Sequence, residues 1–173
     1  MKHPATAHRA RALACAALSV TLPALASAAD RTVKVRGSGI DLVNTAIVHS
    51  KTPTPSGSIT QSTETVELAG DLHGRVLYQI TTVVDSAHGT LVNTGHQVFS
   101  GTVAGSQPVM LHDSKFRFEV NLVTGAGRGS VYLADHIAGP QVNCTLQVAD
   151  TGKNPEGNQT FKYTGECVFH DAG

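Results

Sequence analysis

The 173-residue sequence predicts an all-β protein, an antiparallel barrel, closed or nearly closed, of about eight to ten short strands. Val and Thr supply 35 of the residues after position 29, and β-branched side chains fit a pleated sheet better than a helix. All 17 glycines also follow position 29, where they punctuate short strands with turns. A β-sandwich is the alternative. A barrel is favoured because closure removes edge strands, which invite aggregation in a chain with only 15% charged residues.

The N-terminal segment predicts a secretory signal peptide over residues 1–29. Three cations lie within residues 1–11, an apolar run covers 12–25, and Ala26-Ser27-Ala28 supplies a small-x-small cleavage site. The apolar run is too short to span a bilayer. We therefore expect an exported protein, periplasmic or extracellular, with one barrel domain over residues 30–173.

Alternation of apolar and polar residues with period two is clearest in three segments, 74–84, 116–122 and 142–148. Weaker patterns predict the remaining strands, and clusters of Gly, Pro, Asn and Asp predict the turns between them. In chain order, strands are expected over 31–36, 40–48, 59–69, 74–84, 89–93, 96–104, 116–122, 129–137, 142–148 and 160–169.

The last two predicted strands indicate a hairpin closed by a disulfide between Cys144 and Cys167. Export would place both thiols in an oxidising compartment, where an even pair is expected to join. Folding the chain back near residues 155–156 sets the cysteines opposite each other. The same register brings the apolar side chains of both strands to one face, pairing Val142 with Phe169, Leu146 with Gly165 and Val148 with Tyr163.

Composition and motifs exclude several classes of function. Without the leader, ten basic side chains face 13 acidic ones, so there is no electrostatic footprint for nucleic acid. No later segment reaches the length of a membrane span. There is no G-x-S-x-G elbow, and the sequence assigns neither a catalytic residue nor a cofactor.

Histidine is abundant after the leader, but the spacings do not form a metal motif such as H-x-H or H-E-x-x-H. Most of these residues are expected in solvated loops at strand ends, and no metal ligand is assigned. Convergence of several histidines on a metal ion is kept as a third functional hypothesis. The residues are His49, His73, His88, His96, His112, His136 and His170.

Three glycine-containing segments carry a family resemblance: Val66 to Gly70, Phe99 to Ser106 and Tyr163 to Cys167. They resemble the short strands of the allene oxide cyclase-type and dirigent-like eight-stranded barrels of small exported proteins. The resemblance covers about 100 residues, and no position matches the functional residues of the plant cyclase. It implies a barrel whose interior is able to hold a small apolar molecule, and it does not imply the cyclase reaction.

The first functional hypothesis is noncatalytic binding of a small apolar ligand or a protein partner, because an eight-stranded barrel has room for one small ligand. Tyr78, Phe118 and Tyr163 lie on predicted apolar faces and are the candidate ligand-binding residues. The alternative is an isomerase or cyclase that shapes an apolar substrate inside the barrel, where positioning alone lowers the barrier. The sequence does not decide between them, and it leaves the oligomeric state open.

Overall fold

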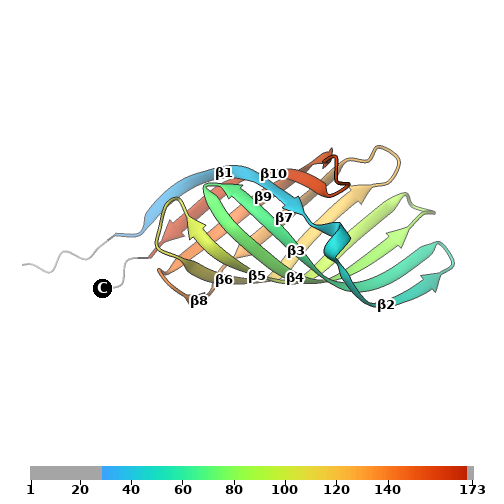
Figure 1. Cartoon of the computed structure of the whole chain (residues 1–173), viewed down its shortest axis with the longest axis horizontal. Helices are drawn as coiled ribbons and strands as arrows, with labels where there is room; N and C mark the ends of the chain where they lie inside the picture. The colour runs from blue at the N-terminus through green and yellow to red at the C-terminus, as the bar shows by residue number, and fades with distance from the viewer. Residues whose placement is uncertain (1–28, 171–173) are drawn as a thin grey trace, which may run out of the picture.

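The computed structural model describes residues 29–170, which form ten β-strands and one short 3-10 helix (Figure 1). In chain order these elements are β1 (Arg31–Asp41), η1 (Val43–Thr45), β2 (Ile47–Thr54), β3 (Gly57–Gly70), β4 (Leu72–Asp85), β5 (Thr90–Val103), β6 (Val109–Asn121), β7 (Gly127–Leu133), β8 (Asp135–Ala138), β9 (Val142–Lys153) and β10 (Gln159–Phe169).

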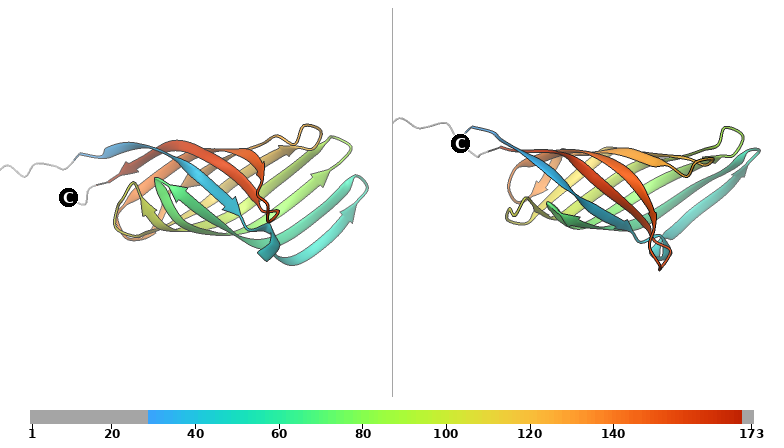
Figure 2. Two further views of the ribbon diagram at one scale, coloured as in Figure 1. Left: turned by 45° about the horizontal axis from the view of Figure 1, so that its top comes forward. Right: turned by 90° about the horizontal axis from the view of Figure 1, so that it is seen from above.

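Eight strands close into an antiparallel barrel, which confirms the predicted fold class and excludes the sandwich. The hydrogen-bonded order is β1-β10-β9-β7-β6-β5-β4-β3, and β3 returns to β1 through five residue pairs from Gly37–Gly70 to Asp41–Val66. Two further strands lie outside this ring: β8 pairs with β6, and β2 pairs with β3. Figure 2 shows the ring from two sides, with the β2–β3 and β4–β5 hairpins projecting at one end.

The β2 strand takes over the edge of β3 where β1 leaves it. β1 pairs with residues 66–70 of β3, the chain then turns through η1, and β2 pairs with residues 57–63. The prediction of one continuous strand over 40–48 was therefore wrong, because η1 interrupts it. The free edge of β2 carries Lys51 and Pro53, two residue types that discourage pairing with another chain.

Two other strands are longer than the sequence predicted. The segments 89–93 and 96–104 form one strand, β5, whose pairing with β6 shifts register between Gly95 and Gln97. β6 begins at Val109, well before the predicted start at 116. The bulge near Asp113 changes which residues face inward, so the sequence before it does not continue the alternation of residues 116–122.

The C-terminal hairpin has the predicted register and the predicted disulfide. β9 and β10 pair Val142 with Phe169, Leu146 with Gly165 and Val148 with Tyr163, and Cys144 is bonded to Cys167 across the hairpin. The turn is built on Asn154, whose side-chain Oδ1 accepts a hydrogen bond from the backbone N–H of Asn158 at 2.9 Å.

One end of the barrel is filled by large apolar side chains. The most deeply buried of these come from six of the eight ring strands, β4, β5, β6, β7, β9 and β10. They are Leu72, Phe99, Val103, Val109, Leu111, Leu133, Val142, Cys144, Tyr163 and Cys167. We call these residues the closed end.

Tyr163 locks the closed end to the β1–β3 seam. Its hydroxyl accepts a hydrogen bond from the Leu72 N–H at 2.7 Å and lies within 3.2 Å of the carbonyl oxygens of Leu72 and Ala69. Glycine is required where this side chain crosses the seam. A Cβ at Gly37 would come within 2.3 Å of the Tyr163 hydroxyl oxygen, and Gly70 has φ of +108°, a backbone conformation that favours glycine.

Within residues 29–170 there is no helix with the length and apolarity that a membrane crossing requires. The predicted signal peptide lies outside the described residues, apart from Ala29, so its cleavage stays a prediction. The disulfide is consistent with export, since such bonds persist mainly in oxidising compartments.

Candidate functional site

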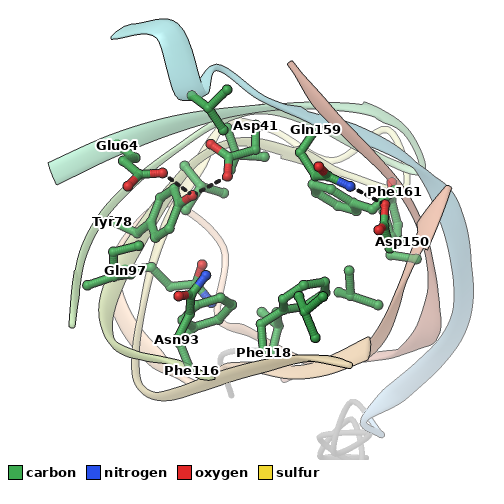
Figure 3. Close-up of a pocket in the computed structure, with 18 of the residues that line it drawn as sticks. Asp41, Glu64, Tyr78, Asn93, Gln97, Phe116, Phe118, Asp150, Gln159 and Phe161 are labelled. Atoms are coloured by element: carbon green, nitrogen blue, oxygen red, sulfur yellow. Dashed lines mark hydrogen bonds between the residues drawn. The ribbon is translucent and has the colours of Figure 1, made fainter. Parts of the chain in front are cut away.

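Beyond the closed end, the barrel contains a cavity of about 670 Å³ that opens to solvent. This volume lies within the range of roughly 300–1,000 Å³ that is usual for small-molecule sites. Figure 3 shows the strands around the cavity, with the lining side chains pointing into it. We call this part of the molecule the open end.

Most of the cavity wall is apolar. Three phenylalanines, Phe116, Phe118 and Phe161, present rings to it, and aliphatic side chains from β3 to β9 fill the spaces between them. Gly127 and Gly129 of β7 leave room for one of these rings, because a Cβ at either position would approach the Phe118 ring to 2.7 Å. The hollow therefore results partly from the Phe118 ring, which lies over glycine backbone instead of filling the centre.

A cluster of two carboxyl groups and a phenol forms the most polar part of the wall. The Tyr78 hydroxyl donates to Asp41 Oδ2 at 2.5 Å and lies 3.0 Å from Glu64 Oε2 (Figure 3). Ser62 Oγ donates to the other Glu64 oxygen at 2.6 Å. We call Asp41, Glu64 and Tyr78 the acid–phenol cluster.

The barrel register brings this cluster together. Glu64 of β3 and Tyr78 of β4 are directly opposite in the ladder, so their side chains lie on the same face. Asp41 is the last residue of β1 and pairs with Val66, two residues from Glu64 on the same inward face. Three strands thus meet at the closure of the ring.

Burial and neighbouring charge shift the proton affinities in this cluster. The pKa of Asp41 is raised from 3.8 to about 6, mainly because burial disfavours the carboxylate. The hydrogen bond from Tyr78 opposes this shift, and the charge of Glu64 adds to it. Burial, and then the charges of Asp41 and Glu64, raise the pKa of Tyr78 far above its ordinary value, so the phenol stays protonated.

The hydrogen bonds of the acid–phenol cluster require one proton more than the Tyr78 hydroxyl supplies. A phenol has one proton to donate, whereas Tyr78 Oη is within bonding distance of a carboxyl oxygen on each side. If both carboxyls are ionised, one of these contacts has no proton. The cluster is therefore satisfied only when it gains a further proton or a cation, which makes it a place where positive charge is stabilised.

Two other polar features face the cavity. Across from Tyr78, Asp150 accepts hydrogen bonds from the Gln159 amide and from the Gly152 N–H (Figure 3). Two acceptor atoms of wall residues, Asp41 Oδ1 and Asn93 Oδ1, are buried behind the cavity surface and have no hydrogen-bond partner within the described part of the chain. Buried acceptors without a partner are costly, so a shift of these side chains toward a donor in the cavity would be favoured.

All three residues predicted from the sequence as ligand-binding lie on the cavity wall, although their roles differ. Tyr78 belongs to the acid–phenol cluster, and Phe116 packs edge-on against it with ring centroids 5.8 Å apart. Phe118 is only half-buried, because it faces the hollow and not a filled core. Tyr163 lies at the floor, where its hydroxyl is already bound to backbone groups. A role in ligand binding remains a prediction for each.

Sequence reasoning did not assign Asp41, Glu64, Asn93 or Asp150 to the site. The available signal was the period of two: Glu64 shares its face with Val66 and Leu68, so an acid at that position points into the barrel. That these acids meet a phenol from β4 depends on how β1 closes onto β3, which the sequence pattern does not contain.

A further buried acid, Asp113, serves the fold. It accepts hydrogen bonds from the Gln97 amide at 2.8 Å and from the backbone N–H groups of Lys115 and Tyr132 at 2.6 and 2.9 Å. These contacts hold the β6 bulge against β5 and β7. Its two oxygens are thus bound by three donors of the protein, and Asp113 does not line the cavity.

The histidines within residues 29–170 lie on the outside of the barrel or at strand ends. His96 and His112 stack with ring centroids 5.7 Å apart, and His112 Nδ1 lies 3.2 Å from Asp135. Among residues 29–170, no three His, Cys, Asp or Glu side chains are grouped so that they could hold a metal ion. The convergence required by the metal-binding hypothesis is thus not found in this part of the chain.

Comparisons with models of protein families, with curated proteins and with solved structures found no match to this chain.

Proposed function

We propose that this chain is an exported small β-barrel that binds a small apolar ligand in the cavity at its open end. The observation that carries the proposal is the combination of a hollow of about 670 Å³, a mostly apolar wall and one polar cluster. Sites for small molecules have this composition, because apolar area supplies affinity and a few polar groups fix orientation.

Two considerations support the rest of the proposal. The Cys144–Cys167 bond is consistent with an oxidising compartment, as export to the periplasm or the extracellular space would provide. A closed eight-stranded ring with an open interior is also what the resemblance to allene oxide cyclase-type and dirigent-like barrels leads us to expect. We retain that resemblance as part of the proposal.

A fluorescence titration with a neutral apolar probe, N-phenyl-1-naphthylamine, tests the binding function. We expect saturable enhancement with the wild-type protein. Thr82 lines the cavity, and Thr82→Trp should weaken probe binding by about tenfold because the indole occupies the hollow. The adjacent Val83 points outward, and Val83→Trp should leave binding unchanged.

A second lining variant, Val120→Trp, guards against a local folding defect at position 82, and far-UV circular dichroism checks that all variants keep the strand content. Enhancement that is weak and unsaturable in the wild type, or equal in the lining and outward variants, would contradict binding in the cavity. The probe is excited at wavelengths where tryptophan does not absorb.

Catalysis of an isomerisation is the second candidate, and the acid–phenol cluster is the observation that favours it. A carboxyl group with a pKa of about 6, hydrogen-bonded to a phenol in an apolar cavity, can hold a proton or transfer it near neutral pH. A reaction that moves one proton between two carbons of an apolar substrate would suit this arrangement, with Asp41 removing the proton and returning it.

The conversion of 3-cyclohexen-1-one to its conjugated isomer provides a direct assay, followed by ultraviolet absorbance. This candidate predicts acceleration above the buffer rate and a loss of at least about a hundredfold in Asp41→Asn, the usual scale for a general acid–base group. Equal rates in wild type, variant and buffer would exclude this class of reaction and leave the binding function standing.

A further inference from the structure

We infer that the cavity selects apolar ligands that carry a protonated amine, with the ammonium group placed against the acid–phenol cluster. The inference rests on the proposed binding function and adds the chemical class of the ligand. It follows from three features of the cavity wall: which hydrogen-bonding groups are unpaired, which charges face the hollow, and where the aromatic rings lie.

The acid–phenol cluster supplies hydrogen-bond acceptors on the cavity wall. Asp41 Oδ1 is buried without a partner within the described residues, and Asp41 Oδ2 and Glu64 Oε2 share the single proton of Tyr78. Glu64 Oε1 is already bound by Ser62. An ammonium group has three donors and no acceptor, so it can donate to the Asp41 and Glu64 carboxyl groups without introducing a lone pair that would oppose them.

The charges that line the cavity are mostly negative. Among the described residues they are three acids, Asp41, Glu64 and Asp150, and one base, Lys153. Lys153 is exposed at the end of β9, and Asp150 is paired with Gln159 and Gly152. Those two partners are neutral and leave the charge of Asp150 uncompensated, but Asp41 and Glu64 lie together on one hydroxyl, so the attraction for a cation and the repulsion of a carboxylate ligand are strongest there.

Aromatic rings border the same place. Phe116 packs edge-on to Tyr78 at an interplanar angle of 67°, and Phe118 follows it along β6 (Figure 3). Ring faces attract ammonium groups through their quadrupole and also cover an apolar ligand body. Carboxylates beside aromatic rings thus suit a molecule with a cationic head and an apolar body better than one with an anionic head.

Isothermal titration calorimetry at pH 8 with three probes of one apolar body tests the inference. The probes are 2-(1-naphthyl)ethylamine, 2-(1-naphthyl)ethanol and 1-naphthylacetate. We expect the amine to bind about tenfold more tightly than the alcohol, and the carboxylate to bind most weakly, because a close charge pair in a partly desolvated site is worth at least about tenfold.

Two variants distinguish a direct contact between the amine and Asp41 from a general effect of the protein's net charge. Asp41→Asn should weaken amine binding about tenfold and leave alcohol binding within about threefold, which also reports that the cavity is intact. Glu67→Gln removes the same charge from β3 but on the outer face, where Glu67 pairs with Arg75 at 2.8 Å. It should change neither affinity.

The outcomes distinguish this inference from the proposed function. Equal affinity for all three probes, or tightest binding of the carboxylate, would overturn the ammonium inference while alcohol binding still supports the apolar site. Equal losses in Asp41→Asn and Glu67→Gln would overturn the placement at the acid–phenol cluster. If none of the three probes binds and N-phenyl-1-naphthylamine does not bind either, the proposed function fails as well.

Discussion

The closed and open ends of the barrel are built largely from the same strands, yet one is packed and the other is hollow. At the closed end, inward positions hold side chains such as Phe99, Leu111 and Tyr163, which meet at the centre. At the open end, β5, β6 and β1 place Asn93, Phe118 and Asp41 inward, and the centre stays empty.

The difference lies in side-chain shape and in hydrogen-bond demand. Phe118 lies over the glycines of β7 and so leaves the centre free, whereas Tyr163 crosses the seam at Gly37 and fills it. Polar inward groups at the open end cannot be covered by apolar side chains without a cost of a few kcal/mol each, so they keep the cavity open. The alternation of residues along a strand thus specifies which side chains point into the barrel, but it does not specify whether they fill the interior.

The largest effect should come from truncating one phenylalanine at each end. Phe99 is fully buried at the closed end, so Phe99→Ala should lower the free energy of unfolding by about 3–5 kcal/mol. Phe118 is half-buried beside the cavity, and Phe118→Ala should cost only about 1 kcal/mol, since less area is lost and no new void forms. Urea denaturation measures both, and equal costs would erase the distinction between the ends.

Removing the disulfide tests the closed end in a different way, because the bond stabilises the fold mainly by restricting the unfolded chain. The cysteines are separated by 23 positions, so the chain-entropy account gives a loss of roughly 3 kcal/mol for the double substitution Cys144→Ser and Cys167→Ser. Apolar probe binding at the open end should survive wherever the variant remains folded. Two alkylatable thiols in the native protein would show instead that the bond does not form.

The substitutions at the closed end lower the free energy of unfolding, whereas replacing Asp41 at the open end should raise it at high pH. The folded-state pKa of Asp41 is raised, so its contribution to stability is fully present below pH 3.8 and is lost as the pH rises through about 6. Asp41→Asn removes the cost of the buried charge. The variant should be more stable than wild type by about 3 kcal/mol at pH 8 and equal to it below about pH 4. Urea denaturation at both pH values measures this difference, and a variant less stable at pH 8 would contradict it.

A smaller loss is expected from Tyr163→Phe, which keeps the ring and removes the hydroxyl at the boundary between the ends. The buried Leu72 N–H then has no acceptor, at a cost of about 1–2 kcal/mol. Hydrogen exchange at the Leu72 amide should accelerate more than that at amides of the open end. An unchanged rate at Leu72 would mean that Tyr163 does not hold the seam.

The features that the sequence predicted, and those that it did not, divide in the same way between the closed and open ends. The C-terminal hairpin was predictable because both cysteines and the apolar residues of two strands agree on one register. The β1–β3 closure was not, because β1 and β3 are joined by a long detour through η1 and β2. The aromatic wall residues Tyr78 and Phe118 were found from alternation, whereas Asp41 and Glu64 became neighbours only through that closure.

The most direct measurement of the central claim is a titration of isotopically labelled protein with 2-(1-naphthyl)ethanol, followed by backbone amide NMR. We predict saturable shifts at Tyr78, Asn93 and Phe118 around the open end and unmoved amides at Leu72, Val103 and Cys144 in the closed end. Shifts that do not saturate, or that spread equally over both ends and the outer face, would contradict a hollow that binds apolar ligands.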